Sequence, residues 1–394
     1  MENNIDLNAA DFEEDKYSRL RLIPWWDQDR LANATVMVVG AGAIGNELIK
    51  DLALLGIGRL LIIDMDRIEH TNLTRSVLFR ARDVGRYKAE VAAERAMEMN
   101  PDVKAKACVA NIIDDIGLGV FRRMDVVLGG LDNREARLAI NQSCYRVNTP
   151  WIDGAIEVLN GFARVFMPPD GACYECTMSE MDWNLINKRK SCALLTQEQM
   201  AEGKIPTTPT SSAIVAGVQV QEMLKLLHKD RGLPTLAGKC YVFNGLTHDS
   251  YVVEYQRKPG CMSHDTYENV EEMPWSVKQM TLRDLLAEVK KEMGQNAVVD
   301  FDRDIATTAT CPCGEHKEIF KPIHKLKGQD LVCPGCGKTM DFDAVHSLTG
   351  AEDFLDKTAF DIGIPPLHIV SGRCGTQIRY FEFSADAEEI FLDL

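Results

Sequence analysis

The sequence lacks a long apolar run and an excess of positive charge, and its first residues are not hydrophobic. Its most apolar stretch, residues 52–63, is short and is interrupted by Arg59, so it cannot cross a bilayer. The formal net charge of -15 argues against nucleic acid as the main partner, because phosphate binding requires a basic surface. Residues 1–15 are acidic and polar, which is unlike a signal peptide. We therefore expect a cytoplasmic protein with no membrane or nucleic-acid partner, whose 12 cysteines are reduced thiols or metal ligands.

What the sequence does contain is a nucleotide-binding pattern. An apolar strand is expected over residues 36–39 and a helix over residues 43–55, and the turn between them is rich in glycine. Such a turn lets phosphate oxygens meet backbone amides at the start of a helix. A second apolar strand, residues 60–63, is followed by a carboxylate that can accept hydrogen bonds from ribose hydroxyls. The residues offered to the nucleotide are Gly40, Gly42, Ala43, Gly45, Asp64 and Asp66.

Four polar side chains that follow this turn distinguish the pattern from an ordinary dinucleotide site. They are Asn72, Arg75, Lys88 and Asp132, the last of which ends a predicted strand over residues 125–130. An NAD or FAD site has no evident use for them. They suit a triphosphate, since two cations neutralise phosphate charge, an amide donates to it and a carboxylate holds Mg²⁺.

Five short motifs therefore follow one another between residues 40 and 133. They are Gly40-Ala-Gly-Ala-Ile-Gly45, Asp64-Met-Asp66, Thr71-Asn-Leu-Thr-Arg75, Val84-Gly-Arg-Tyr-Lys88 and Leu131-Asp-Asn133. In these segments the chain resembles the superfamily of ubiquitin-activating enzymes and of the bacterial enzymes that adenylate sulfur carriers for molybdopterin and thiamine synthesis. Tyr17-Ser18-Arg19 is similar to the N-terminal arm of that superfamily. The resemblance covers about residues 17–264, and one departure is Ser76, where the superfamily usually has glutamine.

The resemblance implies an activity and a role for each of these residues. It implies an enzyme that uses ATP and Mg²⁺ to adenylate the C-terminal glycine of a ubiquitin-like protein, forms a thioester and passes the protein to a conjugating enzyme. The implied roles are charge neutralisation for Arg75 and Lys88, phosphate donation for Asn72, Mg²⁺ binding for Asp132, ribose binding for Asp64, and contact with the ATP of the other subunit of a homodimer for Arg19.

Two pairs of metal-ligand residues lie inside the region of resemblance. A two-residue gap, as in Cys173-Tyr-Glu-Cys176 and Cys261-Met-Ser-His264, lets both ligands of a pair bind one tetrahedral ion. The superfamily closes its adenylation domain with such a split zinc site, usually with a fourth cysteine, so the resemblance implies a structural Zn²⁺ at these four residues. The alternative is that His264 is an ordinary loop histidine and that water or another residue completes the site.

A second set of cysteines, Cys311, Cys313, Cys333 and Cys336, has the form of a zinc ribbon. Each pair of cysteines would form one knuckle of the ribbon. The second knuckle, Cys333 and Cys336, has the usual two-residue gap, but the first, Cys311 and Cys313, is one residue short because only Pro312 separates its cysteines. Either His316 or His324 can replace one ligand, and disulfides are the alternative that a reducing compartment disfavours. The expected content is two Zn²⁺ per chain.

Alternating strand and helix patterns up to residue 165 predict a parallel sheet with both faces covered. The expected fold class is α/β, with a Rossmann-like adenylation domain over residues 1–275. A smaller α+β domain over residues 276–394 resembles the β-grasp ubiquitin-fold domain of activating enzymes, on the segments 280–289 and 354–363. The alternative is a zinc-ribbon appendage that only caps the first domain. The elements expected in the second domain are helices over residues 281–293 and 351–362, strands near residues 298–301, 367–370 and 377–383, and a zinc-ribbon insertion over about residues 308–340.

Cys192 is the candidate nucleophile, within a catalytic-cysteine segment of about residues 178–210. Three cations at residues 188–190 favour its thiolate, and relatives that form a thioester place their cysteine after the first zinc pair. The alternative is a bystander cysteine in a disordered loop.

Three rival functions remain open. A sulfur-carrier adenylyltransferase would form no thioester, and its chain usually ends soon after the zinc site. An inactive scaffold subunit of a heterodimeric activating enzyme would lack the phosphate-binding side chains, whereas this chain keeps them. An NAD or FAD oxidoreductase is the third.

Overall fold

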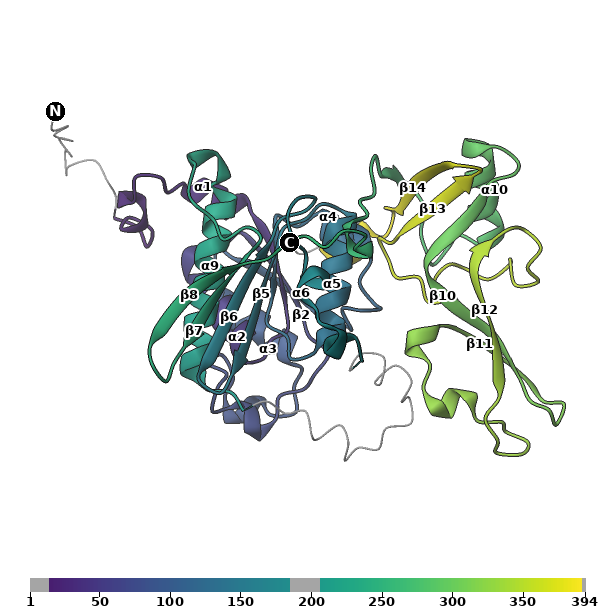
Figure 1. Ribbon diagram of the computed structural model, residues 1–394, viewed down its shortest axis with the longest axis horizontal. Coiled ribbons are helices and arrows are strands. Elements are labelled where there is room, and N and C mark those ends of the chain that lie inside the picture. Colours follow the sequence, from purple (N-terminus) through teal and green to yellow (C-terminus); the bar gives the residue numbers. More distant parts are fainter. Residues whose placement is uncertain (1–13, 185–205, 392–394) are drawn as a thin grey trace.

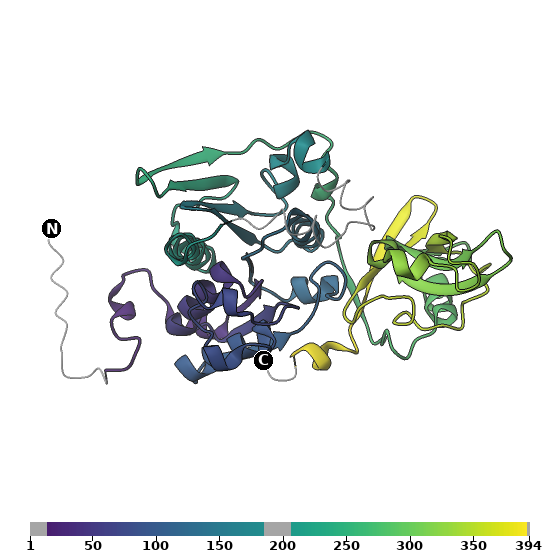
Figure 2. The ribbon, with the colours of Figure 1, turned by 90° about the horizontal axis from the view of Figure 1, so that it is seen from below.

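The computed structural model describes residues 14–184 and 206–391 and contains two sheets (Figures 1 and 2). The first has eight strands in the order β3-β2-β1-β4-β5-β6-β7-β8. Neighbours are parallel from β3 to β5 and antiparallel from β5 to β8. The bounds are β1 Thr35–Val39, β2 Arg59–Ile63, β3 Lys104–Cys108, β4 Val126–Gly129, β5 Trp151–Glu157, β6 Asn160–Phe166, β7 Lys239–Asn244 and β8 Asp249–Glu254.

Helices cover both faces of this sheet because its central strands are apolar on both sides. Along β1, for example, Val38 packs with the helices of one face and Val39 with those of the other. The first face carries α1 Gln28–Asn33, α2 Ala43–Leu55, α3 Lys88–Met99 and α9 Pro209–Leu227, and the second carries α4 Leu118–Arg122, α5 Arg134–Arg146 and α6 Tyr174–Thr177.

The second sheet has the order β11-β10-β13-β14-β9, and β12 also pairs with β10. Helix α10, Leu282–Met293, is capped at its N-terminus by Thr281, whose side chain accepts the Asp284 N–H. It buries Leu282, Leu285 and Val289 against this sheet, as its sequence periodicity predicts. The remaining bounds are β9 Glu271–Met273, β10 Val298–Thr310, β11 His316–Pro322, β12 Asp341–Leu348, β13 Ile369–Cys374, β14 Gln377–Phe383 and α11 Ala387–Phe391.

The predicted α/β class, with a mainly parallel sheet followed by a second, smaller sheet, is confirmed. Three expectations for the second unit differ from the structure. The strand expected near residues 298–301 is present but extends through Thr310, and the strand expected near residues 367–370 begins at Ile369 and extends to Cys374. Residues 351–362 form turns rather than a helix. Two carbonyl groups of this segment accept hydrogen bonds from the first residues of α10. Leu282 N–H donates to Lys357 O at 2.8 Å, and Arg283 N–H donates to Leu355 O at 2.9 Å. These carbonyls are therefore already paired outside the segment, which keeps it in turns. In residues 14–184 and 206–391, no helix is long and apolar enough to cross a membrane.

The two units pack against each other near α4 (Figure 2). Leu367, which lies just before β13, and Ile369, the first residue of that strand, belong to the apolar core of the first sheet. The carboxylate of Glu382 on β14 is fully buried and pairs with Arg122 and Arg123 on the first unit. Both apolar and ionic contacts therefore connect the second sheet to the first.

Candidate functional site

The glycine turn lies at the carboxyl end of β1, beside the ends of β2 and β4. Gly40 N–H donates to Ile63 O and Gly130 N–H donates to Val39 O, which brings the three strand ends together. Gly40 has a φ of 89°, and a Cβ on Gly45 would lie 1.8 Å from Gly40 O, so both positions require glycine. A Cβ on Gly42 would meet nothing within 4 Å, so the start of α2 faces open space.

Asp64 follows β2 and binds the glycine turn directly. Its Oδ2 accepts Ala41 N–H at 2.7 Å, and its Oδ1 accepts Asp66 N–H at 2.8 Å. Burial raises the pKa of the Asp64 carboxyl, and the charge of Lys88 opposes that shift. Each oxygen of a carboxylate has a second lone pair, so Asp64 retains capacity to accept ribose hydroxyls.

Lys88 is the first residue of α3 and points to the same edge of the sheet. Its Nζ lies 2.8 Å from Oδ2 of Asp66, and its side chain is 13% exposed. The Asp66 side chain is 59% exposed, so its carboxylate can turn toward water and leave the ammonium group to a phosphate.

Asn72 and Arg75 lie on the segment between β2 and α3. The Oδ1 atom of Asn72 accepts Glu69 N–H at 2.8 Å, and this bond fixes the orientation of the side chain. The amide N–H groups of Asn72 have no partner among the described residues. Arg75 donates to Thr71 O at 2.7 Å and has no acidic partner in the described ranges. Both donors remain available to an anion.

Asp132 lies in the loop that follows β4. It is exposed, and its one polar contact within residues 14–184 and 206–391 is a weak bond at 3.4 Å from the neighbouring Asn133 amide. Asn133 itself caps α5 by accepting Ala136 N–H at 2.8 Å. A carboxylate that no cation neutralises is free to take a metal ion. Arg19 is also exposed, and it forms no ion pair with any described residue.

The first set of predicted zinc ligands comes together at the end of α5. The ligand atoms of Cys173, Cys176, Cys261 and His264 all lie within 4.8 Å of one another. The Sγ atom of Cys173 is 3.7 Å from that of Cys176 and 3.6 Å from that of Cys261. Thiolates at 2.3 Å from a tetrahedral Zn²⁺ are about 3.8 Å apart, so the set fits this ion. Four protein ligands leave no open position, which suits a structural role.

The second set, Cys311, Cys313, Cys333 and Cys336, also lies within 4.8 Å. These residues lie between β10 and β12, where the two Sγ pairs that join the knuckles are each 3.5 Å apart. The short Cys-Pro-Cys knuckle therefore brings both of its thiols into the cluster. Neither histidine considered as a substitute belongs to the set, and His324 instead contacts Asp114 of the first unit.

Comparison with known proteins identifies the family of this chain. The model of the ThiF family matches residues 13–263. The chain belongs to the ThiF family. The sulfur carrier protein adenylyltransferase of Thermus thermophilus is 32% identical over 257 residues, which are 63% of this chain and 90% of that protein. Ubiquitin-like modifier-activating enzyme 5 of Dictyostelium discoideum is 31% identical over 250 residues, which are 59% of this chain and 64% of that enzyme.

Solved structures of MccB from E. coli share the fold of this ThiF-family chain. The structure with ATP superposes with a TM-score of 0.54 and 26% identity, over 65% of this chain and 75% of MccB. The chain is thus a member of an adenylyltransferase family. Both classes of activity weighed from the sequence, ubiquitin-like activation and sulfur-carrier adenylation, occur among its relatives, whereas the oxidoreductase hypothesis is left without support.

The predicted nucleophile of this ThiF-family chain, Cys192, lies outside the described residues. Four described cysteines belong to neither metal set: Cys108, Cys144, Cys240 and Cys374. Burial raises the pKa of Cys108 and Cys240, and raises that of Cys144 well above its usual value. Burial therefore disfavours the reactive thiolate at these three positions.

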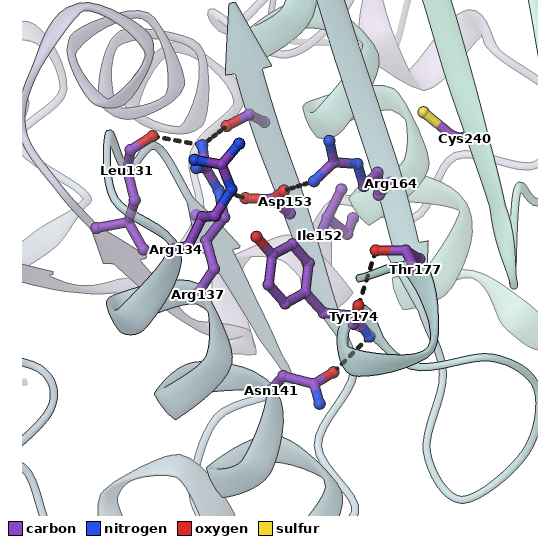
Figure 3. Close-up of polar contacts among 12 residues, drawn as sticks. Leu131, Arg134, Arg137, Asn141, Ile152, Asp153, Arg164, Tyr174, Thr177 and Cys240 are labelled. Carbon is purple, nitrogen blue, oxygen red and sulfur yellow. Dashed lines mark hydrogen bonds and ion pairs between the residues drawn. The ribbon is translucent and has the colours of Figure 1, made fainter. Parts of the chain in front are cut away.

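Sequence reasoning missed a buried ionic cluster behind the Asp132 loop. Figure 3 shows Asp153 of β5 between Arg137 of α5 and Arg164 of β6. The signal available in the sequence is a charged residue within each of two apolar strands, Trp151–Glu157 and Asn160–Phe166. That signal predicts burial with a partner but does not identify the partner.

Proposed function

We propose that this chain activates the C-terminal glycine of a ubiquitin-like protein by adenylation. One observation carries the proposal: a glycine turn, Asp64, Lys88 and Asp132 lie at one edge of the sheet, with the donors of Asn72 and Arg75 on the adjoining segment. This is a set of groups for a nucleoside triphosphate with Mg²⁺. In the reaction, a carboxylate oxygen of the partner attacks the α-phosphorus of ATP, and pyrophosphate leaves as the acyl-adenylate forms.

The roles follow from charge and position. The turn at Gly40, Gly42, Ala43 and Gly45 leaves space for the nucleotide against the start of α2, and Asp64 receives the ribose. Arg75 and Lys88 neutralise charge that develops on the phosphates, Asn72 donates to them, and Asp66 holds Lys88 until ATP arrives. Asp132 would hold Mg²⁺, which supplies further neutralisation of the triphosphate when bound.

The second step of the proposal is transfer to a cysteine. The Cys192 thiolate attacks the carbonyl carbon of the acyl-adenylate, the thioester forms and AMP leaves. The three cations at residues 188–190 and the raised pKa of the buried alternatives support this choice. The unit over residues 276–394 would then present the thioester to a conjugating enzyme, as a ubiquitin-fold-like domain.

Further parts of the proposal concern metals and assembly. We assign Zn²⁺ to both clusters of four ligands, because each offers a tetrahedral set of thiolates or imidazole within 4.8 Å. The exposed Arg19, which lacks a described ion-pair partner, would reach the ATP site of the other subunit of a homodimer. The acidic composition fits a cytoplasmic enzyme.

A second candidate function is adenylation of a sulfur carrier without a thioester. The Thermus thermophilus relative favours it, since it aligns over 90% of its own length. Sulfur-carrier adenylyltransferases usually end soon after the zinc site, whereas this chain continues into a second sheet, which favours the activating-enzyme function. An inactive scaffold is disfavoured because the phosphate-binding side chains are all present.

The decisive assay is exchange of labelled pyrophosphate into ATP in the presence of a ubiquitin-like protein that ends in glycine, sought among the neighbouring genes. Wild type should exchange only with that protein present, and Asp132→Ala should abolish exchange. The folded state should survive this change because Asp132 is exposed. Normal exchange by a well-folded Asp132→Ala variant would show that the Mg²⁺ carboxylate lies elsewhere.

A further inference from the structure

Asp153 is a buried carboxylate that two guanidinium groups approach. It is fully buried at the third position of β5. The Nε atom of Arg137 donates to its Oδ1 at 2.8 Å, and the Nη1 atom of Arg164 donates to its Oδ2 at 2.9 Å (Figure 3). One carboxylate neutralises one guanidinium, so a second buried cation exceeds what ion pairing alone requires.

Arg137 makes contacts that Arg164 does not. Its Nη2 atom donates to Leu131 O and, at 3.2 Å, to Gly154 O. Leu131 immediately precedes Asp132, so a single guanidinium connects β5 to the loop after β4. Because the guanidinium is planar and rigid, fixing its Nε on Asp153 also fixes the direction of its Nη2 toward the loop.

The rest of this loop is held closely as well. Gly130 N–H donates to Val39 O at 2.9 Å, and a Cβ on Gly130 would lie 2.9 Å from the backbone nitrogen of Gly45. On the other side, Asn133 caps α5. The backbone is therefore anchored at Gly130, Leu131 and Asn133, while the Asp132 carboxylate projects into solvent.

We propose that Arg137, oriented by Asp153, is a positioning residue that holds the Asp132 carboxylate where it binds the Mg²⁺ of MgATP. The inference rests on the proposed function, in which Asp132 is the Mg²⁺ ligand. Arg137 touches neither metal nor nucleotide in this scheme. It acts through the backbone of Leu131, and its effect appears in the Mg²⁺ dependence of ATP binding.

The test compares ATP affinity in excess Mg²⁺ with ATP affinity in EDTA, measured by isothermal titration with the full chain and ATP alone. In Arg137→Lys the charge beside Asp153 remains, but a single ammonium cannot replace the forked contacts with the loop. The ratio of the two affinities should fall about tenfold, the factor that accompanies roughly 1.4 kcal/mol. Affinity in EDTA should change little.

Arg164→Lys is the matched control, since Arg164 pairs with the same carboxylate and has no contact with the loop. It should keep the wild-type ratio although its thermal midpoint falls. If Arg137→Lys does not fold, Asp153→Asn takes its place: the amide keeps the shape of the side chain but holds the guanidinium more weakly, and the ratio should again fall.

The outcomes separate this inference from the function on which it rests. If Asp132→Ala loses the Mg²⁺ dependence while Arg137→Lys and Asp153→Asn keep it, the positioning role is wrong and the Mg²⁺ ligand stands. If Arg164→Lys loses the dependence as fully as Arg137→Lys, the cluster serves stability alone and the inference is wrong. If wild type and Asp132→Ala share one ratio, the proposed Mg²⁺ ligand itself fails.

Discussion

The buried carboxylate of Glu382 allows a quantitative test of how the two sheets are joined. Glu382 is fully buried at the contact. Its Oε2 accepts from Nε of Arg122 at 2.8 Å, and its Oε1 lies 2.5 Å from Nη1 of Arg123. In Glu382→Gln the volume is unchanged, but the charge that pairs with both arginines is lost, and the hydrogen bond from Arg122 is then made to a neutral oxygen. A hydrogen bond to a charged group contributes about 1.5–3 kcal/mol.

The two arginine side chains remain 28% and 25% exposed and keep Glu272 as a partner, so water and that residue recover part of the loss. We therefore expect the free energy of unfolding to fall by about 2–3 kcal/mol. This change can be measured by urea titration followed by circular dichroism, with the free energy of unfolding taken from the first cooperative transition.

The matched control is Glu272→Gln. Glu272 contacts the same two arginines, but its side chain is 54% exposed, so its loss should cost less than about 1 kcal/mol. A Glu382→Gln variant within about 0.5 kcal/mol of wild type, or equal costs for the two variants, would refute the argument that burial makes this contact strong.

Other predictions address the metals, the second unit and the nucleophile. Metal analysis should find two Zn²⁺ per chain, from the two four-ligand clusters; one per chain would remove the ribbon site and none would remove both. Deleting residues 276–394 should leave partner-dependent exchange and self-thioester formation while stopping hand-over to a conjugating enzyme, at a lower thermal midpoint because Leu367 and Ile369 no longer cover the first core. Loss of soluble protein would instead favour a capping role. Cys192→Ala should keep exchange but form no reductant-sensitive adduct with the ubiquitin-like partner; an adduct that persists would assign another cysteine, and its absence in wild type would favour the sulfur-carrier function.

Local sequence determined much of the first unit. The glycine turn was readable because a strand, a turn and a helix follow one another within residues 35–55, and their geometry depends on neighbours along the chain. The same holds for each half of a metal site, since two ligands from one tight turn need no distant partner to be recognised. Helix α10 was predicted for the same reason, from the spacing of Leu282, Leu285 and Val289.

The segment 351–362 shows where this reasoning fails. Its apolar residues have a helical spacing, yet its carbonyls accept hydrogen bonds from the first turn of α10 and so cannot form a helix of their own. The strand β10 likewise extends past Phe301 because three other strands pair with it along its length. In both cases a distant segment overrides the local pattern.

Only the tertiary structure decided which charges meet. Arg137 and Asp153 are 16 residues apart, and Arg122 and Glu382 are 260 apart, so no local pattern pairs them. Their partners follow from strand order, which places β5 beside β4, and from the packing of β14 near α4. The sequence determined which residue types were available for phosphate and metal, because that chemistry belongs to single side chains and short turns. The fold determined how the Asp132 loop is held, because a buried ion pair forms only where packing excludes water and brings both charges together.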